Sequence, residues 1–509
     1  MSASIRFLAS LAVMLMLGAC SFGQGSRPRV ELPQELRLPQ SDFAAIFEPR
    51  VGRIAVVTEE GNILITDQTG REQLALTEDG GQVNEQKQAA LYSLPVWSPN
   101  GKELAFVRRV VQRESGETVI EVNPRSVAIQ RGPESSVIEQ GEEGSRVRRP
   151  GEGVHVENAP ARVIIQRGSG DGGLISSAVY IASADGKRPL REVFYSESLD
   201  VTYLDWSPDG SQLAISASDR RGSRTVLNLV APRDGAKPKT VLEGAAITWH
   251  WNPDGRALLA RLTPRSGRAD QLALFELDTQ TETRIPTQGG LAFLSPAFSP
   301  DGGFMLLTER TSEGQRLVLA DRSGKPVRTL TRFNGLARFA WSPAGAKVAY
   351  VAQESLEGGV LRLLDVNSGE NRLLVNRPVV AFFWSPDGER IAVFSTASAD
   401  EVPENFKGFA IIPPMPTEIY LLEVVDPSTG QSRPLFYFAP TAAFQRLVNE
   451  FDRYSRAVTP WAPDGRKLVF TLTFGNAASA RDFVIETEAS GSVDPRVLGN
   501  GSLAFWSPR

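Results

Sequence analysis

The chain has 509 residues, a hydrophobic share of 41% and a formal net charge of −4, so it is long enough to bury a large core. Mild acidity without a basic stripe excludes nucleic acid as a partner, and the single cysteine excludes an internal disulfide. Only two histidines, His155 and His250, are present, which excludes a His-rich metal site, and no G-x-S-x-G motif offers a nucleophile.

The N-terminus reads as an export signal. Arg6 precedes an apolar run that is short for a mature spanning helix, and small residues follow it. Leu-Gly-Ala-Cys, ending at Cys20, resembles the bacterial lipoprotein box, which implies that residues 1–19 are removed and Cys20 is acylated. The alternative is an ordinary signal peptide with an incidental cysteine. Residues 20–42 are expected to form a flexible tether.

In the lipoprotein pattern, Ser21 is not the aspartate that retains lipoproteins at the inner membrane. The resemblance therefore implies an exported, lipid-anchored protein, at the outer membrane facing the periplasm in a diderm or at the cell surface in a monoderm.

A five-residue motif, Trp-Ser-Pro-Asp-Gly, then recurs along the chain. Steps of 43 to 47 residues separate the copies from Trp206 to Trp384, a period typical of propeller blades and of some helical arrays. Short alternating runs such as QLAIS and RIAVF follow the motif, which favours strands and about four per period. The copies begin at Trp97, Trp206, Trp251, Phe298, Trp341, Trp384 and Trp461, with a clipped one at Trp506.

The motif has a physical interpretation as a strand-reversing corner. Proline sets φ for the first position of a type I turn, Asp or Asn suits the second, and Gly accepts the positive φ that follows. The aromatic residue before it is expected to close the innermost strand and pack between blades, as core and not as a ligand-stacking ladder.

These repeats resemble the TolB-type β-propeller repeats of bacterial envelope proteins, which carry the same motif. The resemblance covers most of residues 47–509 and implies an all-β propeller of four-stranded blades over residues 43–509, without the α/β domain that precedes the TolB propeller. If a degenerate first copy of the repeat near Phe47 is counted, we expect eight blades; seven is the alternative. The terminal SLAFWSPR is expected to give the first blade its inner strand and close the ring.

Three insertions, at about 111–173, 397–417 and 439–457, are predicted on one face of the propeller. The first forms either an extended hairpin or a solvated disordered loop. The third spaces its apolar residues as one side of a helix capped by Thr441, which is expected to clamp the rim or, as the alternative, to meet a partner. The helix residues are Phe444, Leu447, Val448, Phe451 and Tyr454. The first inner strand is expected to start on this insertion face, so the lipidated end would leave from it.

The second insertion is apolar and rich in proline, which indicates a contact surface, although packing over its own rim is equally open. The candidate partner-binding residues are Phe406, Phe409, Ile411, Ile412 and Met415. Two hypotheses follow. The preferred one is a non-catalytic platform for an envelope protein partner, with no cofactor, metal or catalytic residue. The alternative is glycan, small-molecule or metal binding, or carboxylate-based hydrolysis, in the propeller channel. His250 is expected to be structural.

Overall fold

A computed structural model describes most of the chain after residue 50. The described residues are 51–112, 119–123, 126–130, 136–141, 144–149, 152–156, 173–287, 291–293, 295–353, 359–402, 410–411, 418–454, 457–475 and 480–509. They belong to one of the two compact units of the chain, Leu38–Arg509. The predicted signal segment, Cys20 and the tether up to residue 42 lie outside the described residues.

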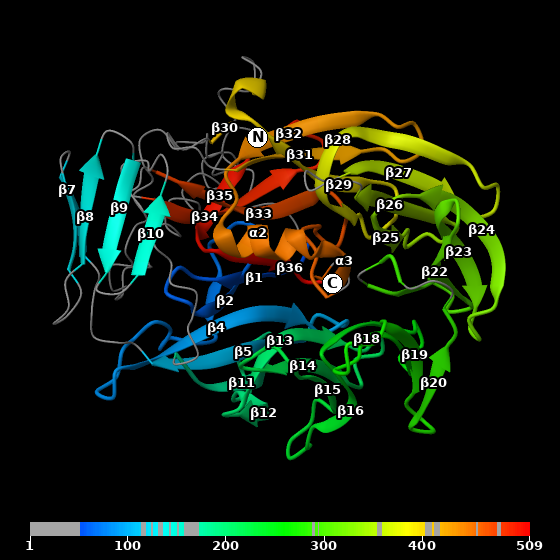
Figure 1. Cartoon of the computed structure of the whole chain (residues 1–509), viewed down its shortest axis with the longest axis horizontal. Helices are drawn as coiled ribbons and strands as arrows, with labels where there is room; N and C mark the ends of the chain where they lie inside the picture. The colour runs from blue at the N-terminus through cyan, green and yellow to red at the C-terminus, as the bar shows by residue number, and fades with distance from the viewer. Residues whose placement is uncertain are drawn as a thin grey trace, which may run out of the picture. The chain divides into compact units, whose positions relative to one another are not determined.

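The fold is an all-β propeller of antiparallel sheets that follow one another along the chain (Figure 1). The first sheets contain β1 (Ile54–Val57), β2 (Ile63–Thr66) and β3 (Gln73–Ala75); β4 (Gln88–Trp97), β5 (Glu103–Gln112), β11 (Leu174–Ser183) and β12 (Arg191–Ser196); and β13 (Leu199–Trp206), β14 (Leu213–Asp219), β15 (Thr225–Val230) and β16 (Lys239–Gly244).

The next two sheets contain β17 (Ala246–Trp251), β18 (Ala257–Thr263), β19 (Gln271–Glu276) and β20 (Thr281–Ile285); and β21 (Ala297–Phe298), β22 (Phe304–Thr311), β23 (Gly314–Asp321) and β24 (Pro326–Phe333). A longer sheet contains β25 (Leu336–Trp341), β26 (Lys347–Gln353), β27 (Gly359–Asp365), β28 (Asn371–Trp384), β29 (Ile391–Ala397), β31 (Ile419–Val425), β32 (Ser432–Phe438) and β30 (Ala410–Ile411). The last sheet contains β33 (Lys467–Phe474), β34 (Arg481–Glu488) and β35 (Arg496–Asn500).

The first and last strands of the propeller pair in one sheet, as the sequence predicts. The terminal strand β36 (Leu503–Trp506) pairs antiparallel with β1, with Trp506 opposite Ile54 and Leu503 opposite Val57 (Figure 1). The first sheet is therefore completed by the last residues of the chain, and β1 has no open edge.

The number of blades depends on how the long sheet is divided. Its strand β28 pairs with β27 mainly through its first half and with β29 through its second half. If it is divided there, and the three-stranded last sheet counts as a blade, the described residues give the predicted eight. The count of eight stays a prediction.

In six repeats the motif forms the corner between the inner strand, which ends at the motif aromatic, and the strand that follows. The aromatics of these repeats are Trp97, Trp206, Trp251, Phe298, Trp341 and Trp384. At the corner from Trp206, the backbone N–H of Gly210 donates to the Ser207 carbonyl at 2.8 Å, and Gly210 has φ of 73°. The Asp209 carboxylate accepts the Ser211 backbone N–H at 3.0 Å. The side of the propeller that carries these corners is called the corner face, and the opposite side the insertion face.

The point where the chain enters the propeller corrects one prediction. Arg53, just before β1, donates its backbone N–H to the Ser507 hydroxyl at 3.0 Å, and Ser507 donates its own to the Arg53 carbonyl at 2.7 Å. Because Ser507 lies at the corner after β36, β1 begins on the corner face. The expectation that the N-terminal segment joins on the insertion face is wrong, since the C-terminal strand takes the inner position and the chain starts at the second one.

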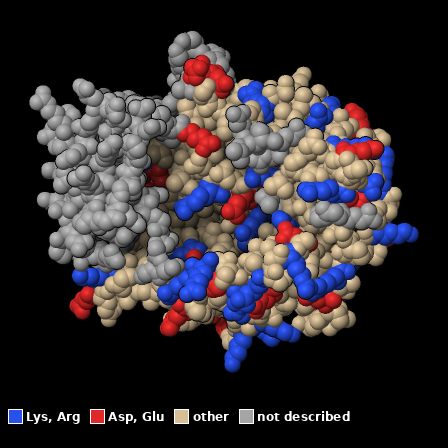
Figure 2. Space-filling model, in the orientation of Figure 1, with Lys and Arg blue, Asp and Glu red and all other residues tan. Residues whose placement is uncertain are grey.

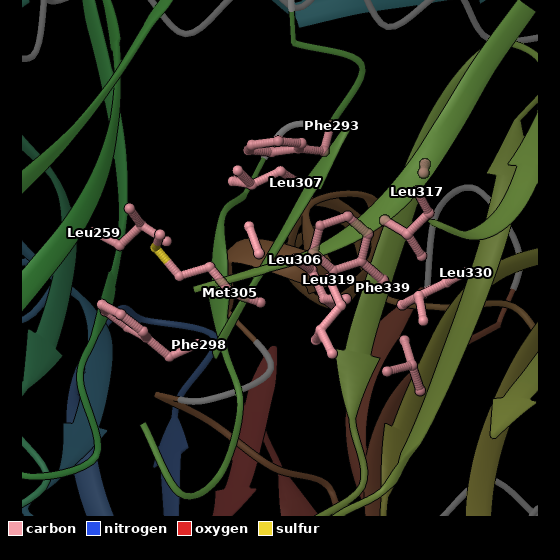
Figure 3. Packing of buried hydrophobic residues seen from close by; sticks show 14 of the residues in the cluster. Leu259, Phe293, Phe298, Met305, Leu306, Leu307, Leu317, Leu319, Leu330 and Phe339 are labelled. Carbon is pink, nitrogen blue, oxygen red and sulfur yellow. The ribbon is translucent and has the colours of Figure 1, made fainter. Parts of the chain in front are cut away.

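Aliphatic and aromatic side chains fill the space between consecutive sheets. In one such cluster Met305 from β22 lies between Leu259 from β18 and Phe298 from β21 (Figure 3). All three are less than 2% exposed. The unbranched thioether adapts to the uneven gap between two sheets, and burial of this kind is the main stabilisation available to a chain without disulfides.

The first insertion forms a sheet of its own, in the order β10-β9-β8-β7-β6. Its strands are β6 (Val119–Asn123), β7 (Ser126–Gln130), β8 (Ser136–Gly141), β9 (Gly144–Arg149) and β10 (Glu152–Val156). The predicted hairpin would pair the similar segments 124–132 and 160–168. It is wrong, because β7 already pairs with β6 on one side and β8 on the other.

The second insertion contributes a short 3₁₀ helix, η3 (Ala399–Glu401), and the two-residue strand β30. Ile411 of β30 pairs parallel with Phe438 of β32, which extends that sheet by one strand. Ala410 and Ile411 thus pair with a strand of their own sheet, and the contact surface stays a prediction. Phe406, Phe409, Ile412 and Met415 lie outside the described residues.

Candidate functional site: the central plug and the corner-face cavity

The third insertion forms two short helices, α2 (Ala442–Asn449) and α3 (Phe451–Tyr454), which we call the central plug. The helix predicted from the apolar spacing is confirmed, with a break at Glu450. The Thr441 hydroxyl caps α2 by accepting the Phe444 backbone N–H at 3.1 Å, and it donates to the Ser502 carbonyl at 2.5 Å. The five predicted apolar residues are buried, each at most 9% exposed.

The plug contacts inner strands that belong to distant sheets, so it lies inside the propeller. On one side, the Tyr454 ring packs edge-on against Tyr203 of β13, with ring centroids 4.8 Å apart. On the other side, the Phe451 ring lies 4.7 Å from Phe382 of β28 and under the Arg338 guanidinium. The expected position, clamping the rim, is therefore wrong; the helices close the centre instead.

The plug also explains why the last sheet has three strands. Where the other repeats have an inner strand before the motif aromatic, this segment is helical. Two isolated bridges to β33, Pro440 with Leu472 and Trp461 with Leu468, flank the helices. The inner strand of this repeat is replaced by residues that cross the centre.

A cavity of about 530 Å³ opens on the corner face beside the plug. Ala457, Val458 and Thr459, which follow the plug, form part of its lining. Motif residues form most of the wall: Trp97, Pro99, Trp206, Pro208, Trp251, Pro253, Pro300, Trp506 and Pro508. Asp205, His250 and Arg509 are its ionisable groups. The volume suits a small ligand or a short peptide segment.

Three of the motif tryptophans bond to the preceding sheet. The indole N–H of Trp206 donates to the Val96 carbonyl at 3.1 Å, and those of Trp384 and Trp461 donate to Ala340 and Phe383 at 3.2 and 2.8 Å. Each acceptor immediately precedes the motif aromatic of the preceding repeat. Among the eight motif aromatics only Trp341 is more than 9% exposed. Their placement is that of core residues, and little ring surface remains for stacking a ligand.

His250 joins two sheets in the repeat whose motif aromatic is phenylalanine. Its Nδ1 accepts the backbone N–H of Phe298 at 2.6 Å, and the two rings lie 5.8 Å apart. Phe298 has no indole N–H, so this bond takes the place of the tryptophan contact. The structural role predicted for His250 agrees with this geometry.

The motif aspartates are occupied by turn chemistry. The Ser299 hydroxyl, and then the backbone N–H of Gly303, hold the pKa of Asp301 below its ordinary value. A carboxylate fixed as an ionised acceptor in this way is a poor proton donor for hydrolysis. Among the described residues, no group of three or more His, Cys, Asp or Glu residues is placed to hold a metal ion.

Charges of both signs are mixed on one face of the molecule, and no helix among the described residues could cross a membrane. Lys and Arg residues alternate with Asp and Glu over the face shown in Figure 2, so no single-sign field covers it. In the part of the chain that the structure describes, every helix is too short or too polar to cross a bilayer.

Sequence reasoning missed a second set of contacts between consecutive sheets. The boundary between two consecutive sheets is here called a seam. An arginine near the start of the outermost strand donates to a backbone carbonyl in the turn between the third and fourth strands of the next sheet. The pairs are Arg191 with Pro232, Arg328 with Val366 and Asn367, Arg372 with Pro427 and Ser428, Arg433 with Ser490, and Arg496 with Gln68. The signal was available, because each arginine lies one to three residues before an aliphatic residue of that strand.

No family model matches the chain, and no curated protein matches it. Among solved structures, the dihydro-heme d1 dehydrogenase NirN in complex with DHE is similar over 100% of this chain and 87% of its own, with 12% identity and a TM-score of 0.50. TolB from Acinetobacter baumannii is 15% identical over 74% of this chain and 82% of its own, with a TM-score of 0.33. Oligogalacturonate lyase in complex with manganese is 13% identical over 57% of this chain and 74% of its own, with a TM-score of 0.39. At such identity the likeness concerns the fold alone: the chain is a β-propeller.

Proposed function

We propose that this protein is a non-catalytic β-propeller that binds a protein partner in the bacterial envelope and is held there by lipid on Cys20. The observation that carries the proposal is the central plug. In this chain the centre, where a propeller could pass or hold a small substrate, is crossed by Phe451 and Tyr454. With the centre occupied, the surfaces that remain for binding are the two faces of the propeller, and these suit recognition of a protein.

The insertion face is the proposed contact surface. The insertions between β5 and β11 and between β29 and β31 both leave their sheets on this side. The second contains the apolar residues Phe406, Phe409, Ile411, Ile412 and Met415, a composition that suits contact with protein. Since the chain enters the propeller on the corner face, the insertion face is not the side at which the tether attaches.

The envelope location rests on the sequence. Arg6, the apolar run after it and the box ending at Cys20 support export and acylation, and the repeats resemble those of TolB-type envelope propellers. We expect the protein at the outer membrane facing the periplasm in a diderm, or at the cell surface in a monoderm.

A second candidate is ligand binding in the corner-face cavity. It is favoured by the cavity volume of about 530 Å³ and by Asp205, which is 6% exposed and lines the cavity. The ligand would be a small molecule, a glycan fragment or a peptide end, and no covalent step is implied.

The test is crosslinking and affinity capture from intact envelopes of the producing bacterium. The full lipoprotein is compared with a chain lacking residues 114–170 and carrying a Gly-Ser replacement of residues 406–416. The matched control replaces the corner-face residues Pro99, Pro208 and Pro253 with alanine. We expect one partner that is lost with the insertion variant and kept with the control. Loss with the control alone would favour the cavity, and equal capture by all three chains would overturn the proposed surface.

A further inference from the structure

The seams between sheets provide an internal comparison. At five of them in the described residues, an arginine of the outermost strand reaches the next sheet and fills the gap, as Arg328 does with 2.8 and 2.7 Å bonds to Val366 and Asn367. In a seam of this kind the carbonyl groups of the facing turn already accept hydrogen bonds from the guanidinium.

The seam between the β13–β16 sheet and the β17–β20 sheet departs from this pattern. Lys239 stands at the start of the outermost strand β16, in the place that arginine takes in the five seams described above. Its ammonium group donates to the Gln280 side-chain oxygen at 2.6 Å, and Gln280 itself donates to the Leu277 carbonyl at 2.5 Å. A cavity of about 510 Å³ is present at this seam, which we call the seam pocket.

The walls of the seam pocket are positively charged. Four cations line it, Arg233, Lys237, Lys239 and Arg256, against the two carboxylates of Asp209 and Asp278. Asp209 already accepts the hydroxyls of Ser207 and Ser211, at 2.6 and 3.0 Å. Among the described residues, no carboxylate forms an ion pair with Arg233, Lys237 or Arg256.

Three aliphatic side chains, Leu229, Val241 and Leu277, also line the pocket, so apolar contacts are available beside the charged groups. Three cations that line the recess therefore form no ion pair within the described residues, although two carboxylates share the lining, and the apolar side chains offer contact for a hydrocarbon or sugar body. Phosphate suits such a lining, because its oxygens accept several charge-assisted hydrogen bonds from Arg and Lys together.

We propose that the seam pocket binds a phosphate-bearing ligand through Arg233, Lys237 and Arg256. The phosphate belongs to either a lipid headgroup or a water-soluble phosphorylated compound. The pocket lies on the corner face, between the corners at Asp209 and Gly255, whereas the proposed protein partner binds the insertion face. The two proposals are thus independent, and failure of one leaves the other standing.

The experiment is calorimetric titration of the detergent-solubilised full chain with inorganic pyrophosphate and, separately, with dihexanoyl phosphatidic acid below its micelle concentration. The pocket variant is R233Q/K237Q/R256Q. The matched control, R221Q/R268Q/R466Q, removes the same charge from other exposed positions. Lys239→Arg keeps the charge and supplies the side chain that fills the other seams. Thermal unfolding of each variant shows that it remains folded.

We expect saturable binding that the pocket variant weakens about tenfold or more and that the control changes less than about twofold. Lys239→Arg should also weaken it, and higher ionic strength should reduce it. Tighter binding of the phosphatidic acid than of pyrophosphate would identify a lipid headgroup, and the reverse a soluble phosphate compound. Absence of saturable binding to both probes, or equal losses in the pocket and control variants, would overturn the proposal.

Discussion

The hydroxyl of Tyr203 donates a 2.6 Å hydrogen bond to the backbone carbonyl of Arg453, 250 residues further along the chain. The Arg453 guanidinium in turn lies over the Tyr203 ring, 4.6 Å from its centroid. Tyr454 returns a bond from its own hydroxyl to the Thr202 carbonyl at 3.3 Å. These contacts hold the end of the central plug against the inner strand β13. The position of the plug therefore depends on Tyr203.

Tyr203→Phe is expected to lower the free energy of unfolding by about 1 to 2 kcal/mol, because it leaves the Arg453 carbonyl without its partner and removes no ring contact. Hydrogen exchange should report faster exchange in α3 than in the wild type. Tyr195→Phe is the matched control, since the Tyr195 hydroxyl bonds Glu197 at an exposed site and its loss should change stability little. Unchanged protection of α3 in Tyr203→Phe would show that the hydroxyl does not hold the plug.

The closing strand gives a second prediction. Removal of residues 503–509 deletes β36 and leaves β1 as an unpaired edge. It also removes Trp506, a residue of the adjoining hydrophobic core that is 1% exposed. We expect a loss of several kcal/mol in the free energy of unfolding, together with concentration-dependent association through the open edge. Chemical denaturation and size-exclusion chromatography measure the two effects.

Removal of Pro508 and Arg509 alone is the control for the closing strand. It keeps every strand pair of β36 with β1 and should leave the chain monodisperse at the concentrations where the longer deletion associates. Association of both variants to the same extent would mean that the strand edge is not the cause.

Much of the fold could be predicted because the same turn motif and strand pattern recur along the chain. The corner at Gly210 and the closing strand at Trp506 follow from local turn chemistry and from alternation along the strand. The position of the plug could not be predicted in this way. Spacing showed one apolar side from Phe444 to Tyr454, but the surfaces it covers, at Tyr203 and Phe382, come from distant repeats.

The seams show a different limit of sequence reasoning. Arg328 and Lys239 hold equivalent positions in their strands, and both are polar residues at a sheet edge. Only the structure shows that the arginine reaches two carbonyls of the next sheet while the lysine meets one side-chain oxygen beside a cavity. The sequence does not show which residues of neighbouring sheets lie side by side. It therefore cannot distinguish a seam bridged by arginine from one that contains a cavity.

The lipid anchor gives a third prediction. Cys20→Ser removes the thiol that acylation requires, so the exported chain should move from the membrane fraction to the soluble fraction. Mass spectrometry of the N-terminal peptide should show acyl chains on the wild type and none on the variant. A Ser21→Ala chain is the control and should stay in the membrane fraction. Retention of the Cys20→Ser chain on washed membranes would contradict anchoring by lipid.

Asp482 gives a prediction on pH. Burial raises the pKa of its carboxyl, the bond from the Thr473 hydroxyl at 2.7 Å opposes this rise, and the nearby Glu59 adds to it. Because the pKa of Asp482 is higher in the folded state, there is a pH range in which the folded protein keeps the proton on this carboxyl and the unfolded chain has lost it. This group therefore stabilises the fold below its ordinary pKa of about 3.8, and the contribution falls as pH rises from there through the folded pKa.

Asp482→Asn removes the ionisation, so the variant should gain melting temperature relative to the wild type as pH rises from about 4 to 7. Asp426→Asn is the contrasting variant. The Ser428 hydroxyl lowers the pKa of Asp426 to about 2, so that group stabilises the fold above its ordinary pKa and loses the effect as pH falls toward 2. Because Asp426 is only partly buried, solvent screens its charge, and its effect should be small and of opposite sign. Parallel pH profiles for the two variants, measured by thermal unfolding, would contradict a raised pKa at Asp482.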